Sequence, residues 1–113
     1  MIQKTEPTYR VKVHLAGDFE DARRSLRRQA LEEGLCVTLH PVEFVYTAGM
    51  ESGVTVGLTN YPRFPKSREE LFDRAVRVAV RLMDDLCQHS ALVEADDQTQ
   101  WLTKRPEDLK STK

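Results

Sequence analysis

The segment "YRVKVHLAG", residues 9 to 17, alternates apolar and polar side chains with a period of two. Such alternation predicts a β-strand with one buried face, because successive side chains of a strand point to opposite sides. The apolar set is Tyr9, Val11, Val13 and Leu15. Gly17 then turns the chain, and Asp18 is suited to cap the helix that follows.

Two segments have apolar residues at helical spacing. The first predicts a helix over about residues 19 to 33, which Gly34 ends as a C-terminal stop. Ser67 and Glu70 have the spacing of a capping box, in which each side chain satisfies a backbone N–H of the other residue. A broad apolar stripe follows them, so we expect the second helix to reach roughly Gln88.

The remaining segments are typical of strands. "LCVTLHPVEFVYTAG" (35–49) is rich in β-branched and aromatic residues and is interrupted at His40–Pro41, which indicates two short strands or one long bent strand. "AGMESG" (48–53) predicts a hairpin loop, and "VTVGLTN" (54–60) the next strand. "ALVEA" (91–95) and "TQWLT" (99–103) predict a closing hairpin.

These elements give the order β-α-β-β-β-α-β-β. They predict an α+β fold: a mostly antiparallel or mixed sheet of five or six strands, with two helices on one or both faces. We expect residues 1–103 to form one domain and residues 104–113 a charged, flexible tail. Exposed sheet edges favour a homodimer or a higher homo-oligomer.

The composition excludes several classes of function. The 113 residues carry 17 basic and 18 acidic side chains, a net charge of -1, so direct binding to DNA or to an anionic membrane is not expected. No apolar run approaches the roughly 20 residues that span a bilayer, and the start lacks a signal peptide. We expect a cytoplasmic protein, in the host cytoplasm if phage-encoded, whose Cys36 and Cys87 are buried free thiols.

The segment "NYPRFP", residues 60 to 65, is the best candidate for a binding site. Its two prolines stiffen the chain and hold the residues before them extended. Such a loop presents the rings of Tyr61 and Phe64 and the guanidinium of Arg63 at a low entropy cost. The following helix N-terminus favours an anion, so the loop suits a nucleotide held also by Asn60. The alternative is that both rings fill the edge of the core.

Further arginines could contact an anionic ligand. Arg74 and Arg77 lie in the second helix within reach of the loop, and Arg24 and Arg28 share one face of the first helix. The arginines of the first helix can be interpreted in two ways: as a phosphate-binding surface or as a solvated face neutralised by nearby acids. The second arrangement is the more common one.

The sequence contains no recognisable catalytic, cofactor or metal motif. It lacks the common serine-nucleophile and phosphate-binding glycine motifs, so we expect no cofactor. The pairs Cys36 with His40 and Cys87 with His89 match no common zinc spacing, so no metal is expected. His14 with Asp18, or His89 with Asp84 and Asp85, would form an acid–base pair only through accidental proximity. A protein that is not an enzyme is therefore expected.

The segment "EEGLCVTLHPVEFVYTAGMESGVTVGLTNYPRFP", residues 32 to 65, resembles small proteins of phages and mobile elements. The overall order of elements is similar to that of the first family of phage anti-Thoeris proteins. This resemblance implies a cytoplasmic sponge that binds cyclic ADP-ribose isomers without destroying them, in sites formed by oligomerised subunits. It also implies that some relatives bind cyclic oligonucleotides.

The leading hypothesis from the sequence is therefore non-catalytic sequestration of a small anionic nucleotide signal, which would counteract host anti-phage defence. One rival is an inhibitor that presents the arginine-rich helix or a sheet edge to a protein partner. A second rival is a small nucleotide-processing enzyme that uses one of the histidine pairs.

Overall fold

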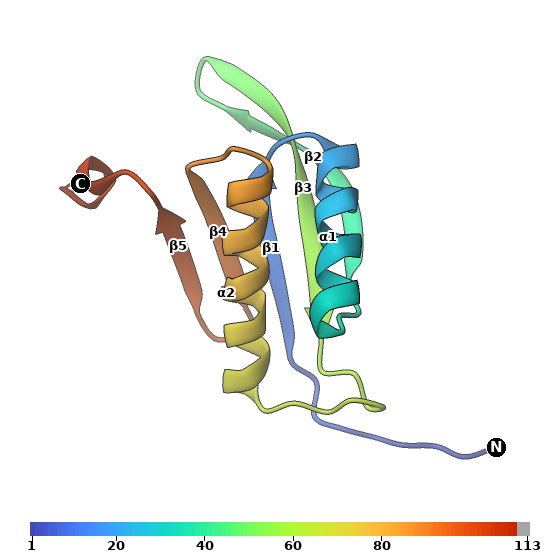
Figure 1. Cartoon of the computed structure of the whole chain (residues 1–113). Helices are drawn as coiled ribbons and strands as arrows, with labels where there is room; N and C mark the ends of the chain where they lie inside the picture. Colours follow the sequence, from blue (N-terminus) through green and yellow to red (C-terminus); the bar gives the residue numbers. More distant parts are fainter. Residues whose placement is uncertain (111–113) are drawn as a thin grey trace.

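The computed structural model describes residues 1–110 of the chain. Its strands and helices alternate as two β-α-β units that share one sheet (Figure 1). In chain order the elements are β1 (Arg10–Ala16), α1 (Phe19–Glu33), β2 (Thr38–Tyr46), β3 (Gly49–Thr59), α2 (Arg68–Asp85), β4 (Ser90–Ala95), β5 (Thr99–Thr103) and a 3₁₀ helix (Pro106–Lys110).

The five strands form one antiparallel sheet in the order β2-β3-β1-β4-β5. Each β-α-β unit is split, because β3 lies between β1 and β2, and β1 lies between β3 and β4. This is the ferredoxin-like arrangement with β5 added at one edge. Both helices lie on the same side of the sheet, and no helix of residues 1–110 covers the other side, which we call the open face (Figure 1). The predicted α+β class is confirmed.

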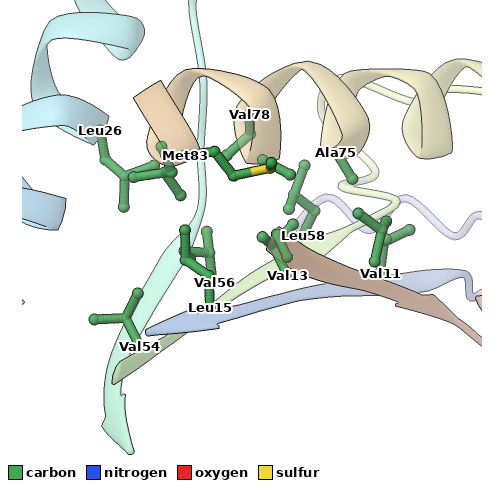
Figure 2. Packing of buried hydrophobic residues seen from close by; sticks show 14 of the residues in the cluster. Val11, Val13, Leu15, Leu26, Val54, Val56, Leu58, Ala75, Val78 and Met83 are labelled. Atoms are coloured by element: carbon green, nitrogen blue, oxygen red, sulfur yellow. The ribbon is translucent and has the colours of Figure 1, made fainter. Parts of the chain in front are cut away.

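The core lies between the sheet and the two helices. Val13 of β1 pairs with Val56 of β3 and Val93 of β4, and all three side chains are fully buried. The alternation that predicted β1 therefore sets its inward face, as expected for a half-buried strand. Figure 2 shows how Ala75, Val78 and Met83 of α2 lie over this layer of the sheet, with Leu26 of α1 beside them.

The strands differ in detail from the sequence interpretation. Residues 38 to 46 form one strand, the second of the two alternatives, and Pro41 is tolerated because β2 is an edge strand. The "AGMESG" segment is mostly strand, because β3 already begins at Gly49. The hairpin connection is short and contains Ala48 at a φ of 67°. α2 ends at Asp85, slightly before the predicted Gln88.

Other surface features also differ from expectation. Cys36 and Cys87 are free but exposed, not buried. The tail contains the 3₁₀ helix Pro106–Lys110, whereas residues 111–113 of the predicted flexible tail lie outside the described residues. None of the helices within residues 1–110 combines the length and the apolar character needed to cross a membrane.

The predicted capping box is present at the start of α2. The Ser67 hydroxyl accepts from the backbone N–H of Glu70 at 3.1 Å, and Glu70 Oε1 accepts from the backbone N–H of Ser67 at 2.9 Å. The hydrogen bonds from the backbone and the side chain of Ser67 lower the pKa of Glu70, because they stabilise its charged form. The box starts α2 at a fixed residue and so fixes where the preceding loop must end.

We expect this box to make stability depend on pH. Because the folded pKa of Glu70 is lowered, its contribution is present above the ordinary glutamate pKa of about 4.3 and is lost as pH falls through the folded value. Glu70→Gln should therefore reduce the loss of stability below about pH 4.3 in denaturant melts. Ser67→Ala should cost about 1 kcal/mol at neutral pH. An unchanged acid slope in Glu70→Gln would contradict this assignment.

Candidate functional site

The proline-containing loop between β3 and α2 is held by its own hydrogen bonds. The backbone N–H of Phe64 donates to the Tyr61 carbonyl at 2.8 Å, which closes a tight turn around Pro62 and Arg63. Asn60 spans the base of the loop. Its side-chain amide donates to the Pro7 carbonyl at 2.8 Å, and its carbonyl oxygen accepts from the backbone N–H of Lys66 at 2.9 Å. Asn60 thus positions the loop, and it is not among the residues that line the neighbouring cavity.

The aromatic rings of the loop point to solvent and do not fill the core. Tyr61 is 45% exposed and Phe64 55% exposed, with ring centroids 6.1 Å apart and ring planes tilted by 41°. The Arg63 guanidinium lies over the Phe64 ring, 5.4 Å from its centroid. It has no ion pair among the described residues. The rings are therefore available to a ligand.

A cavity of about 360 Å³ lies beside these rings. It is formed where the end of α1, the end of β3, the loop and the first turns of α2 meet. Its volume lies near the lower end of the roughly 300–1,000 Å³ typical of small-molecule sites. The lining residues are Glu33, Gly34, Leu35, Cys36, Leu58, Thr59, Tyr61, Phe64, Lys66, Leu71 and Arg74.

Arg74 is the polar residue of this cavity whose hydrogen bonding is incomplete. Its Nη1 donates to the Gly34 carbonyl at 2.6 Å, which ties α2 to the end of α1. Its Nε is buried and has no hydrogen-bond partner among the described residues. Buried polar groups are nearly always satisfied, so Arg74 has hydrogen-bonding capacity that the described residues do not use. A guanidinium in this position suits a carboxylate or a phosphate.

Arg24, Arg28 and Arg77 do not line the cavity, and each pairs with an acidic side chain. Arg24 Nη1 lies 2.9 Å from Asp21 Oδ1, and Arg28 Nη1 lies 3.4 Å from Asp85 Oδ2. Arg77 Nε lies 3.9 Å from a carboxylate oxygen of Glu33. For α1, the contacts of Arg24 and Arg28 correspond to the neutralised face that the sequence analysis gave as the more common arrangement. Of the eight predicted residues, the structure brings Tyr61, Phe64 and Arg74 to the cavity, with Arg63 beside them.

The predicted anion site at the N-terminus of α2 has a competing occupant. The Glu70 backbone N–H donates to the capping hydroxyl, and the Glu70 carboxylate itself takes the N–H of Ser67. Glu69 and Glu70 also place negative charge in the first turn. Arg74 and Lys66, rather than the helix end, are therefore the cationic groups that line the cavity.

The sequence analysis did not find the hydrogen-bonded cluster around His14. His14 does not pair with Asp18. Its Nδ1 lies 2.8 Å from the Thr55 hydroxyl, and its Nε2 lies 2.9 Å from Glu94 Oε1. The partners are 41 and 80 residues away in the chain, so only the strand order reveals them. Within residues 1–110, no three metal-ligating side chains come together as a metal site requires.

Fold and cavity together define an α+β protein with a pocket of nucleoside size and an arginine in its wall. Two solved structures of a phage SAM lyase, where SAM is S-adenosylmethionine, share this fold. One, in complex with S-methyl-5'-thioadenosine, has a TM-score of 0.70 at 14% identity and covers 91% of this chain and 95% of the lyase chain. The apo structure has a TM-score of 0.68 at 12% identity, and the match covers 93% of this chain and 97% of the lyase chain. No protein-family model matches the chain, and no curated protein does.

These comparisons correct one expectation from the sequence. The protein was expected not to be an enzyme, and that expectation is contradicted because the proteins that share its fold over nearly the whole chain are lyases. The anti-Thoeris resemblance is supported only in general terms. The lyase is also a phage protein, and the ligand in one structure is a nucleoside, but no family model links this chain to the anti-Thoeris family. At 12% and 14% identity the likeness shows the fold alone.

Proposed function

We propose that the cavity beside Tyr61 and Phe64 binds an adenosine that carries a sulfonium or thioether group, and that the protein cleaves S-adenosylmethionine as a lyase. The observation that carries this proposal is a cavity that has Arg74 in its wall and the exposed rings of Tyr61 and Phe64 at its rim. The lyase with bound S-methyl-5'-thioadenosine, which shares the fold, supports the same class of ligand.

Each part of S-adenosylmethionine has a suitable partner around the cavity. The adenine can stack on the exposed rings of Tyr61 and Phe64, a contact worth about 1–3 kcal/mol for a base. The sulfonium is a cation, which aromatic faces attract. The carboxylate of the amino-acid part fits Arg74, and its ammonium group fits the carboxylate of Glu33 on the same wall. A cavity of about 360 Å³ suits one nucleoside better than a cyclic oligonucleotide.

The apolar character of the cavity also suits the bond cleavage. When the bond between sulfur and the amino-acid chain breaks, its electron pair stays on sulfur, and the cation becomes the neutral S-methyl-5'-thioadenosine. The amino-acid fragment leaves by losing a proton or by closing onto its own carboxylate, so the reaction consumes no water. A change that removes charge is favoured where apolar walls exclude water, such as those of Leu35, Leu58 and Leu71.

The test is to incubate the purified protein with S-adenosylmethionine and to follow both products by liquid chromatography and mass spectrometry. Heat-denatured protein is the control, because the sulfonium also decays without an enzyme. We expect S-methyl-5'-thioadenosine to form faster than in the control and with turnover above one per protein.

A parallel thermal-shift panel should contain S-adenosylmethionine, S-methyl-5'-thioadenosine, cyclic ADP-ribose isomers and cyclic oligonucleotides. We expect the first two to raise the melting temperature. A protein that binds only a cyclic ADP-ribose isomer and returns it unchanged would contradict the proposal, as would a rate equal to that of the control.

A further inference from the structure

The open face of the sheet carries one continuous row of side chains across all five strands. Strand register places His40 of β2 opposite Thr55 of β3, Thr55 opposite His14 of β1, His14 opposite Leu92 of β4, and Leu92 opposite Trp101 of β5. Directly paired residues of antiparallel strands share a face, with Cβ atoms about 4.5–5.5 Å apart. Two of the chain's three histidines therefore flank a single hydroxyl.

We propose that Thr55, His14 and Glu94 form a second reactive centre, which transfers the acyl group of small activated esters. The three side chains are linked in series, with 2.8 Å between Thr55 Oγ1 and His14 Nδ1 and 2.9 Å between His14 Nε2 and Glu94 Oε1. A hydroxyl, an imidazole and a carboxylate connected in this order are the parts of a base-activated nucleophile.

The hydrogen bonds determine the direction of the proton. A carboxylate only accepts, so the bond to Glu94 requires the proton of a neutral imidazole to be on Nε2. Nδ1 then presents a lone pair, and the Thr55 hydroxyl must be its donor. Glu94 thus fixes the tautomer in which His14 can act as a base towards Thr55.

The cluster of Thr55, His14 and Glu94 is reached from the open face of the sheet, whereas the nucleoside cavity lies at the ends of the helices. Thr55 and His14 are partly exposed, and no helix of residues 1–110 lies over them (Figure 1). The residues on either side of Thr55 on the same face of β3 are Gly53 and Gly57, where the Phe44 ring and the Thr38 side chain of β2 lie close to the strand. Leu92 and the half-exposed Trp101 continue the row as an apolar surface suited to an acyl chain.

The reaction has two balanced steps. In the first, Thr55 Oγ1 bonds to the ester carbonyl carbon while its proton passes to His14 Nδ1, and the leaving alkoxide takes that proton as the carbon–oxygen bond breaks. In the second, water attacks the acyl-threonine and His14 Nδ1 takes a proton from the water; as the bond between the acyl carbon and Thr55 Oγ1 breaks, that proton passes to Oγ1 and the acid leaves. His40, exposed and directly across from Thr55, is placed to donate to the oxygen that becomes negative in both steps.

The test uses p-nitrophenyl acetate as the probe and mass spectrometry of digested protein to locate the acetyl group. We expect a burst of p-nitrophenolate and an acetyl group on Thr55 in the wild type. Thr55→Val should abolish both, Thr55→Ser should retain them, and His14→Gln should slow the burst by about 10²-fold or more. Thr38→Val is the matched control, because Thr38 is an exposed threonine of β2 on the same face, and its hydroxyl has no hydrogen bond to a histidine among the described residues.

The alternative is that the cluster only ties β1, β3 and β4 together. In that case Thr55→Val and His14→Gln would lower the melting temperature, and their hydrolysis rates would equal that of Thr38→Val. That result would overturn the proposal, as would acetylation found only on residues other than Thr55. Turnover of S-adenosylmethionine in Thr55→Val tests the nucleoside cavity separately, because no residue of the cluster lines that cavity.

Discussion

Arg74→Met should weaken the binding of S-adenosylmethionine by about tenfold to a hundredfold and leave the melting temperature almost unchanged. The guanidinium is one of two cationic groups that line the cavity, the other being Lys66, and a hydrogen bond to a charged group contributes about 1.5–3 kcal/mol. A factor of ten in affinity corresponds to about 1.4 kcal/mol. Methionine keeps the apolar stem and removes the buried Nε that lacks a partner, which offsets the lost bond to the Gly34 carbonyl. Isothermal titration calorimetry measures the effect.

Two comparisons separate this role from general damage. Arg24→Met is the matched control, because Arg24 is exposed and pairs with Asp21, and neither residue lines the cavity. It should bind S-adenosylmethionine nearly as the wild type does. S-methyl-5'-thioadenosine has no carboxylate, so its affinity should change little in Arg74→Met. Equal losses for both ligands, or for both variants, would show that Arg74 does not recognise the carboxylate.

Local patterns in the sequence were sufficient to predict most of the helices and strands. The alternation in β1, the cap at Asp18 and the capping box at Ser67 each depend on residues within a few positions of one another, and the structure has all three. The strand order was not accessible in this way. Whether residues 38 to 46 form one strand or two depends on their lying at the sheet edge, where a proline such as Pro41 is tolerated.

At the candidate site, too, the parts formed by neighbouring residues could be predicted, and the parts brought together by the fold could not. The stiff loop with Tyr61 and Phe64 was predictable, because its prolines and aromatics are consecutive. The wall opposite the loop comes from the end of α1, and Arg74 reaches a carbonyl 40 residues away. His14 likewise meets partners from two other strands, while the nearby Asp18 that sequence proximity suggested caps α1 instead. Proximity in sequence therefore could not identify the hydrogen-bond partners of His14.

The close approach of β1 to β3 predicts a second large effect, at Gly53. A Cβ added to Gly53 would lie 2.5 Å from the Leu15 carbonyl oxygen and would also overlap the Phe44 ring. The carbonyl belongs to the backbone of the adjacent strand and cannot move without disturbing the ladder. We expect Gly53→Ala to lower the free energy of unfolding by about 2–3 kcal/mol, within the range for overpacked cores. Urea denaturation monitored by circular dichroism measures it.

Gly57→Ala is the control, because it makes the same change on the same face of the same strand. The nearest atom there is the Thr38 hydroxyl oxygen at 2.5 Å, the end of an exposed side chain that can rotate away. The free energy of unfolding of this variant should fall by less than about 1 kcal/mol or rise slightly, since alanine restricts the unfolded chain more than glycine does. Equal losses in the free energy of unfolding for the two variants would mean that the β1 backbone does not limit the space for a side chain at Gly53. If the approach at Gly53 does hold β1 in register, Gly53→Ala should also displace His14 from Thr55, two residues further along β3.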